Sequence, residues 1–357
     1  MSKGKQDTGE AAGSVDLAAL ADVVERFRGK KIALCGDFIA DEFQFGEISR
    51  VSREAPVLIL QHRETQLLPG GGANAANNLA DLGAGVLPVT VVGDDAAGNA
   101  LLEYFRGKRC DVSGILRLRG WTTPVKTRFL AGWPHTRRQQ VLRVDRARND
   151  APPETVRRQL LRKLRERLEA ADVLLVSDYG SGIFSPLLLR DALRARRRKP
   201  PLVTLDSRYA LTSFTSSGIT AATPNEPELE SLYGERIVPD TETLERLARA
   251  TMDTLKLQSL LVTRGKDGMA LFERSGRTTM IPVHGSRLAV DVTGAGDTVI
   301  AAFTLALACG AKHLEAAHIS NFAGGIVVMK HGTATVNAAE LLGAIRSEIT
   351  GAGAADS

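Results

Sequence analysis

Cysteines and long apolar runs are scarce in this sequence. Its three cysteines in 357 residues, Cys35, Cys110 and Cys309, lie far apart and include no Cys-x-x-Cys pair for zinc or redox chemistry. No run of about 18 apolar residues is available for a membrane-spanning helix, and residues 1–13 are polar, unlike an export signal. The sequence therefore predicts a soluble cytoplasmic protein without a membrane partner.

Aromatic residues are also few, at 5% of the chain, and no aromatic RNA-binding motif, Cys/His finger or basic zipper occurs. The net charge of +5 would suit nucleic acid. However, the arginines concentrate in the expected helical stretches 157–167 and 190–199, and such runs are usually solvated helix faces. We therefore expect no nucleic-acid partner.

The chain is long enough for one large domain, and we place it at residues 16–350 between loose tails at 1–15 and 351–357. Apolar stretches with the length of buried strands alternate with helical patterns such as 73–82. This alternation predicts an α/β fold with a mostly parallel sheet covered by helices on both faces. The expected strands are 31–35, 86–92, 173–177, 202–205 and 260–263.

Two segments, about 42–61 and 122–145, depart from this alternation. Both are rich in β-forming residues and lack an intervening helix, so they predict a small second sheet. In open α/β sheets the ligand site lies beyond the carboxyl ends of the strands. We interpret the second sheet as a lid that excludes water from that site.

The most informative stretch is Asp291–Asp297, with the sequence Asp-Val-Thr-Gly-Ala-Gly-Asp, followed by an apolar helical run over 298–308. Glycines directly before a helix let backbone N–H groups converge on an anion, and the helix N-terminus favours negative charge. Asp297 would lie beside such a phosphate cradle and would accept a proton from an attacking hydroxyl. The alternative is that Asp297 only caps the helix.

A second glycine-rich stretch, Gly70-Gly71-Gly72-Ala73-Asn74, lies where a strand passes into a helix. Its glycines permit close approach of the backbone to a ligand, and Asn74 offers both a donor and an acceptor to sugar hydroxyls. The alternative is a flexible turn without a ligand. A Walker-type Gly-x-x-x-x-Gly-Lys-Ser/Thr loop is absent, which disfavours a P-loop kinase.

Both glycine-rich stretches, together with Gly36–Asp41, resemble signatures of the PfkB (ribokinase-like) carbohydrate kinases. The resemblance extends from about residue 31 to 342 and implies a ribokinase-like fold. It also implies that Gly294, Ala295 and Gly296 form an anion hole and that Asp297 is the catalytic base. The substrate-binding residues that it implies are Asp37, Asp41, Gly71, Gly72 and Asn74.

The same resemblance implies ATP and Mg²⁺ as cofactors. Asn225-Glu226-Pro227-Glu228 fits an Asn-x-x-Glu motif in which Asn225 and Glu228 organise the magnesium and its waters, although it also suits a helix start. The implied nucleotide-lining residues are Thr263, Arg264, Gly265, Asn321 and Gly332, together with Asn225. A monovalent cation near Asp291 and Thr293, and a homodimer formed through the lids, are implied as well.

Within the family, the chain most resembles the bacterial heptose 7-phosphate kinases, through stretches such as 49–57, 122–128, 139–145 and Ser177-Asp178-Tyr179. This implies transfer of the ATP γ-phosphate to O1 of D-glycero-β-D-manno-heptose 7-phosphate. The abundant cations of the expected lid suit a phosphorylated sugar, because arginine binds phosphate bidentately. The alternative is ordinary surface charge. The substrate-binding residues expected from this comparison are Lys126, Arg128, Arg137, Arg143 and Asp178.

The sequence departs from those kinases at two lysine positions, which hold Ser181 and Arg208 here. A PfkB kinase for another sugar or sugar phosphate therefore remains the alternative enzyme. A catalytically silent sugar or nucleotide sensor is the alternative outside the enzymes, since a fold does not fix function. No His-x-Gly-His motif of a nucleotidyltransferase occurs, so we expect kinase activity alone.

Overall fold

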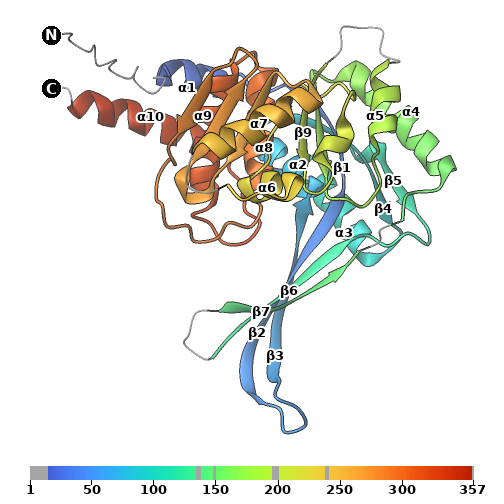
Figure 1. Cartoon of the computed structure of the whole chain (residues 1–357). Helices are drawn as coiled ribbons and strands as arrows, with labels where there is room; N and C mark the ends of the chain where they lie inside the picture. The colour runs from blue at the N-terminus through green and yellow to red at the C-terminus, as the bar shows by residue number, and fades with distance from the viewer. Residues whose placement is uncertain (1–14, 134–137, 148–149, 195–200, 238–240, 356–357) are drawn as a thin grey trace, which may run out of the picture.

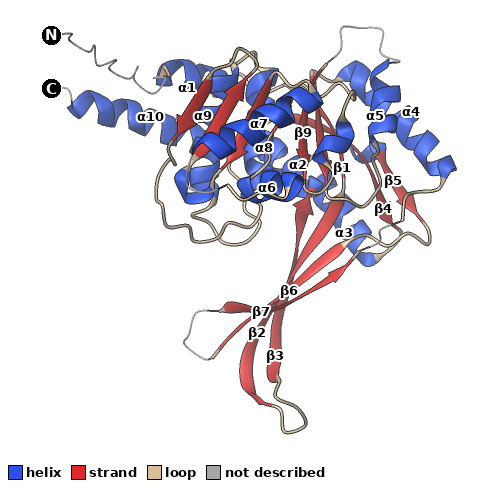
Figure 2. Ribbon diagram, viewed as in Figure 1, coloured by secondary structure: helices blue, strands red, loops and turns tan. Residues whose placement is uncertain are grey.

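A computed structural model describes residues 15–133, 138–147, 150–194, 201–237 and 241–355. Within these residues nine strands form a central sheet in the order β13-β12-β11-β10-β9-β8-β1-β4-β5 (Figures 1 and 2). All neighbours pair in parallel except β11 with β12 and β12 with β13. The strands are β1 (Lys31–Gly36), β4 (Gly85–Gly93), β5 (Ile115–Leu118), β8 (Val173–Asp178), β9 (Leu202–Ser207), β10 (Ala221–Ala222), β11 (Ser259–Thr263), β12 (Met269–Glu273) and β13 (Thr278–Ile281).

Helices cover both faces of this sheet. Strand β1 shows why, because its side chains alternate between two apolar cores: Ile32 and Leu34 pack into one, and Ala33 and Cys35 into the other. The first core lies under α1 (Leu17–Glu25), α2 (Gly72–Asp81), α3 (Ala96–Gly107), α8 (Ala295–Ala308), α9 (His313–Val327) and α10 (Ala338–Ala355). The second lies under α4 (Glu154–Ala170), α5 (Pro186–Arg194), α6 (Glu226–Tyr233) and α7 (Thr241–Leu255).

A second sheet of four strands, in the order β3-β2-β6-β7, projects from the body (Figure 1). One residue, Asp37, separates β1 from β2, and β3 runs directly into α2, so the second sheet is anchored beside the ends of central strands. Strands β2 and β6 pair in parallel, while β3 and β7 flank them antiparallel. These strands are β2 (Phe38–Val51), β3 (Leu58–Gly71), β6 (Val125–Gly132) and β7 (Gln139–Arg146), and we call them the lid sheet.

The structure confirms the predicted α/β class, the mostly parallel sheet and the smaller sheet. The five predicted strands correspond to β1, β4, β8, β9 and β11. One detail differs: α10 continues to Ala355, so helical backbone extends into the segment 351–357 expected to be a loose tail. Among the described helices, none combines the length and the apolar character needed to cross a membrane.

Candidate active site

The candidate site lies where the carboxyl ends of β8, β9, β10 and β11 meet the N-terminus of α8 and the base of the lid sheet. A cavity of about 300 Å³ opens there, which we call the central cavity. Segments far apart in sequence contribute to it, as expected for a parallel sheet whose strands end at one edge. The predicted site residues that line it are Asp41, Gly71, Lys126, Arg128, Asn225, Glu228, Thr263, Gly294, Gly296 and Asp297.

The N-terminus of α8 forms one wall of the central cavity. Gly294 caps the helix with a left-handed φ of 79°, and a side chain there would place Cβ 2.5 Å from Asn74 Nδ2. At Gly296 a Cβ would meet open space, so this position leaves room for a ligand at the helix N-terminus. Ala295 N–H instead donates to the carbonyl of Val292 at 3.2 Å. Of the predicted trio, Gly294 and Gly296 line the cavity.

Asp297, in the first turn of α8, is 4% exposed. Its Oδ2 accepts a hydrogen bond of 2.9 Å from Asn74 Nδ2, and its Oδ1 accepts one of 2.8 Å from the Tyr179 hydroxyl. Burial raises the pKa of Asp297 to about 6, against the opposing effect of these two donors. The carboxyl is therefore mostly ionised at neutral pH and has a pKa suited to a general base.

Asn74 has a different position from the one expected. It is fully buried, and its amide nitrogen reaches Asp297 as well as the Gly294 carbonyl, at 3.4 Å. It also accepts a hydrogen bond from Asn78. Asn74 thus braces the carboxylate and the helix cap. Gly72 has a similar packing role, because a Cβ there would lie 3.0 Å from the Asp37 carbonyl oxygen.

Asp41 projects from β2 into the central cavity and is 3% exposed. Its Oδ1 forms an ion pair of 2.6 Å with Arg128 Nη1 on the neighbouring strand β6. Close approach of the Asp41 carboxylate requires glycine at position 70, where a Cβ would lie 2.6 Å from Oδ2. Asp41 and Arg128 therefore act as a pair, and each fixes the side chain of the other.

A second cavity of about 430 Å³ lies between the loop after β8 and strands β6 and β7, and we call it the β6–β7 cavity. Asp37, Arg143 and Ser181 line it, while Lys126 and Arg208 line both this cavity and the central one. Burial lowers the pKa of Lys126, and the nearby arginines act in the same direction. The two cavities are thus neighbours that share a basic wall.

The aspartates at the ends of β1 and β8 are held by internal hydrogen bonds. Asp37 accepts from the backbone of Tyr179 at 2.8 Å and of Ser181 at 3.0 Å, and from the Ser181 hydroxyl, while burial raises its pKa to about 6. Asp178, expected to bind substrate, accepts from the Ser207 hydroxyl and from Gly180 N–H. Neither cavity wall includes Asp178, so its substrate-binding role stays a prediction.

The two residues predicted to hold magnesium begin a helix and also line the central cavity. Asn225 and Glu228 make a reciprocal capping box at the N-terminus of α6, with bonds of 2.8 and 3.0 Å. Both also line the central cavity, as does Thr263, which pairs with Asn225 through a parallel bridge. Their oxygen donors match the preference of Mg²⁺. Burial raises the pKa of Glu228.

The other residues predicted to line the nucleotide do not gather in one cavity. Arg264 pairs with Glu226 at 2.7 Å, and Asn321 donates to the Pro282 carbonyl at 2.8 Å. Gly265 has a left-handed φ of 56° and open space around it. These contacts occupy the Arg264 and Asn321 side chains within the protein, outside the walls of the cavities described here.

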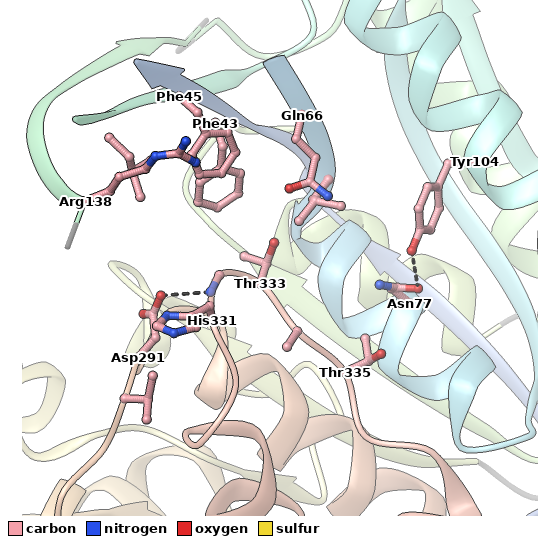
Figure 3. Close-up of a pocket in the computed structure, with 15 residues that line it drawn as sticks. Phe43, Phe45, Gln66, Asn77, Tyr104, Arg138, Asp291, His331, Thr333 and Thr335 are labelled. Atoms are coloured by element: carbon pink, nitrogen blue, oxygen red, sulfur yellow. Dashed lines mark hydrogen bonds between the residues drawn. The ribbon is translucent and has the colours of Figure 1, made fainter. Parts of the chain in front are cut away.

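Gly332 lies in a third cavity, of about 740 Å³, between the lid sheet and the loop after α9. Figure 3 shows Phe43, Phe45 and Arg138 of the lid side facing His331 and the threonines of this loop. Gly332 N–H donates to Asp291 Oδ2 at 2.9 Å, and the other carboxylate oxygen accepts from Thr293 N–H at 2.9 Å. Arg137, also expected at the substrate, falls outside the described residues.

Several residues of the central cavity were not among the predicted site residues: Tyr179, Asp206, Arg208, Thr223 and Thr333. Tyr179, Asp206 and Arg208 follow or end β8 and β9, so their place at strand carboxyl ends was a usable signal. Thr333 follows the predicted Gly332 in a loop expected to line the nucleotide, whereas Thr223 carried no such signal. Their buried hydroxyls lack a hydrogen-bond partner among the described residues.

The chain is similar in sequence to proteins of one known family. The family model described as "pfkB family carbohydrate kinase" matches residues 31–340. The chain belongs to this family. Its sequence is 40% identical over 311 residues to the bifunctional protein HldE of Geobacter metallireducens, and 37% identical over 336 residues to that of Paramagnetospirillum magneticum. These alignments cover 87% and 93% of this chain but 62% and 67% of the relatives. The chain thus spans about two thirds of their length.

Solved structures show the same fold at low sequence identity. Ribokinase of Arabidopsis thaliana, complexed with ribose and ATP, matches with a TM-score of 0.68 at 20% identity, covering 89% of this chain and 99% of that one. Phosphofructokinase-2 of Escherichia coli, in complex with potassium, matches with a TM-score of 0.71 at 18% identity and the same coverage. The PfkB carbohydrate kinases have this ribokinase-like fold, and the family implies the use of ATP and Mg²⁺.

Proposed function

We propose that this chain transfers the γ-phosphoryl group of ATP to O1 of D-glycero-β-D-manno-heptose 7-phosphate, giving the 1,7-bisphosphate. The observation that carries the proposal is the juxtaposition of Asp297 and the open helix N-terminus at Gly296 in one cavity, next to a second cavity with a basic wall. The resemblance to heptose 7-phosphate kinases and the 34–40% identity to bifunctional HldE proteins support this choice of acceptor.

The chemistry follows from the geometry of the central cavity. Asp297 takes the proton of the sugar hydroxyl, whose oxygen forms a bond to the γ-phosphorus while the bond from phosphorus to the bridging oxygen of ADP breaks. Negative charge on the transferring group lies at the N-terminus of α8, which favours anions. Asn225 and Glu228 would hold Mg²⁺ through its waters, and the ion would supply charge neutralisation at the ATP phosphates.

The acceptor would lie across both cavities. Asp41 would hold hydroxyl groups of the sugar near Asp297, while Lys126, Arg143 and Arg208 would meet the 7-phosphate in the β6–β7 cavity. Charge-assisted hydrogen bonds to phosphate are about twice as strong as neutral ones. A phosphorylated acceptor therefore explains why so many cations of the lid sheet and the β9 end gather in one cavity.

ADP release, measured with heptose 7-phosphate and with the unphosphorylated heptose, tests the proposal. We expect kcat/KM to be at least about 10-fold higher for the phosphorylated sugar, from one or more charged hydrogen bonds. Equal values of kcat/KM for the two sugars would show that the enzyme does not recognise the 7-phosphate. Fructose 6-phosphate and ribose complete the panel. If no acceptor supports ADP release, the kinase proposal itself is wrong.

A different sugar phosphate is the second candidate, and one observation favours it. Ser181 stands where the heptose kinases carry lysine, and its hydroxyl donates to Asp37. The β6–β7 cavity thus lacks an ammonium group at that point, although Arg208 restores a cation at the second changed position. Higher kcat/KM for another phosphorylated sugar in the same assay would favour this candidate over heptose 7-phosphate.

The homodimer that we propose would form through the lid sheet. Side chains alternate along its strands, so Lys126 and Arg128 face the site while Phe129 faces the opposite side. That outer face surrounds a hollow of about 940 Å³ and includes the exposed apolar residues Val57, Leu58, Val141, Leu142 and Val144. Exposed apolar patches mark interaction sites.

Changing Leu142 to Asp should convert the dimer to a monomer in sedimentation velocity experiments, because Leu142 is 55% exposed and lines the hollow of this face. The matched control, Leu187→Asp, changes an exposed leucine on α5 and should leave the assembly state unchanged. A wild-type monomer at micromolar concentration would disprove the dimer.

We propose that the reaction takes place in the cytoplasm, where ATP is available.

We also propose a monovalent cation near Asp291. The Asp291 carboxylate accepts hydrogen bonds from the backbone N–H groups of Thr293 and Gly332, and so connects the two loops beside which the cation would lie. ADP release in potassium compared with tetramethylammonium buffer would test this. Equal rates in both buffers would remove the cation from the proposal.

A further inference from the structure

Tyr179 occupies a position between the two cavities that the reaction outlined above leaves unexplained. It follows β8 directly and lines both the central cavity and the β6–β7 cavity. Its hydroxyl donates to Asp297 Oδ1 at 2.8 Å, and its backbone N–H donates to Asp37 Oδ2 at 2.8 Å. The Lys126 ammonium lies 5.0 Å from the centre of its ring. Tyr179 is therefore fixed by contacts of its hydroxyl, its ring and its backbone N–H.

The hydroxyl is suited to donate a hydrogen bond and to retain its proton. Burial raises the pKa of Tyr179 well above its usual value, and the Asp297 and Asp206 carboxylates raise it further. Asn74 holds the other oxygen of Asp297 from α2, 223 positions away in sequence. One donor on each oxygen prevents rotation of the carboxylate and leaves its remaining lone pairs to the cavity.

We propose that Tyr179 is the positioning residue of the catalytic base: its hydroxyl orients the Asp297 carboxylate toward the sugar hydroxyl and stabilises its ionised form. This inference rests on the proposed kinase function, but one of its two tests, the melting temperature, does not require kinase activity. Tyr179 touches Asp297 and the wall of the acceptor cavity, so it acts on the reacting atoms through Asp297.

The other charges around Asp297 make this donor important. Asp41 on β2 raises the pKa of Asp297, whereas Lys126 on β6 lowers it. Asp206 on β9, Arg208 after it and Glu228 on α6 also line the central cavity. Three carboxylates therefore share a small space with Asp297, and three cations, Lys126, Arg128 and Arg208, oppose them. A hydroxyl donor stabilises the anion without adding another charge.

Changing Tyr179 to Phe removes this donor and keeps the ring. Hydrogen bonds to charged groups are strong enough that their loss raises the pKa of the carboxyl by roughly 1 to 2 units. Because the base is active when ionised, kcat should fall most at low pH. We expect a loss of roughly 5- to 50-fold at pH 6 that shrinks to within about 2-fold at pH 9. The KM for ATP should change little.

A second measurement does not require activity. The pKa of Asp297 is about 6 in the folded protein, above the ordinary value of an aspartate. The free energy of unfolding therefore decreases as the pH rises from the ordinary pKa to about 6. A further rise in Tyr179→Phe extends the loss to higher pH. The melting temperature of the variant should therefore match that of the wild type most closely near pH 5 and fall below it by a few degrees at pH 8.

Tyr233→Phe is the matched control. The Tyr233 hydroxyl forms a hydrogen bond of 3.0 Å with the Thr251 hydroxyl, and Tyr233 does not line the central cavity. Its effects on kcat and melting temperature should not vary with pH. A loss in Tyr179→Phe that is the same at every pH, in both measurements, would reduce Tyr179 to a structural residue. Absence of ADP release in the wild type, with the expected melting profile, would overturn the proposed function and leave the link between Tyr179 and Asp297 in place.

Discussion

The two walls of the candidate site differ in how their functional groups are held. On the α8 side, Asp297 and Asn74 are buried and bonded to each other. On the lid side, Arg143 is exposed and forms an ion pair with Asp145, its neighbour on the same strand. Asp41 and Arg128 lie between these extremes as a buried ion pair. This comparison suggests that the buried wall performs the phosphoryl transfer and that the lid wall selects the acceptor.

The largest effect should come from Asp297→Asn, which removes the proton acceptor from the buried wall and keeps the anion site at the helix N-terminus. We expect kcat to fall roughly 10²- to 10⁴-fold, the usual contribution of a general base. ATP affinity, measured by calorimetry, should stay within about 2-fold. Asp253→Asn, at an exposed aspartate on α7, serves as the control. Wild-type turnover in Asp297→Asn would show that Asp297 is not the catalytic base.

Lys126→Ala tests whether the lid wall selects phosphorylated sugars. Lys126 lines both cavities, and its loss should lower kcat/KM for the sugar phosphate by roughly 10- to 150-fold, the value of a charged hydrogen bond. The unphosphorylated sugar should be much less affected. Lys163→Ala, on α4, is the control. Parallel losses for both sugars would show that the variant damages the lid sheet instead of phosphate recognition.

Asp41→Asn probes the boundary between the two walls. It keeps the size of the side chain, turns charged hydrogen bonds to the sugar into neutral ones, and removes the ion pair with Arg128. The difference between these bond types predicts a rise of about 10-fold in KM for the sugar, with a smaller change for ATP. Steady-state kinetics with each substrate varied in turn would separate the two. Equal rises would contradict a sugar-binding role for Asp41.

Arg143→Ala should have the smallest effect. The guanidinium is exposed and already paired with Asp145, and exposed ion pairs contribute little, so we expect a loss of at most about 5-fold in kcat/KM for the sugar phosphate. A loss as large as that of Lys126→Ala would contradict this expectation, because Arg143 would then bind the phosphate as strongly as Lys126.

The sequence by itself determined the features that depend on local pattern. Short apolar stretches and helical periodicity predicted β1 and α2, because burial repeats with the geometry of the element. The Asp291–Asp297 motif located the helix N-terminus, since the left-handed backbone at position 294 requires glycine. Alternation of lid residues likewise predicted a second sheet, although β2 and β3 are longer than expected.

Only the tertiary structure decided which side chains meet. Tyr179 and Asn74 approach Asp297 from 118 and 223 positions away, and Arg128 meets Asp41 across two strands that pair in parallel. Asp178, predicted to bind substrate, turns to Ser207, while its neighbour Tyr179 lines both cavities. Arg264 was likewise taken up by Glu226. Motifs specify residue types, whereas the directions of side chains depend on strand register and on the competition between nearby partners for each hydrogen bond.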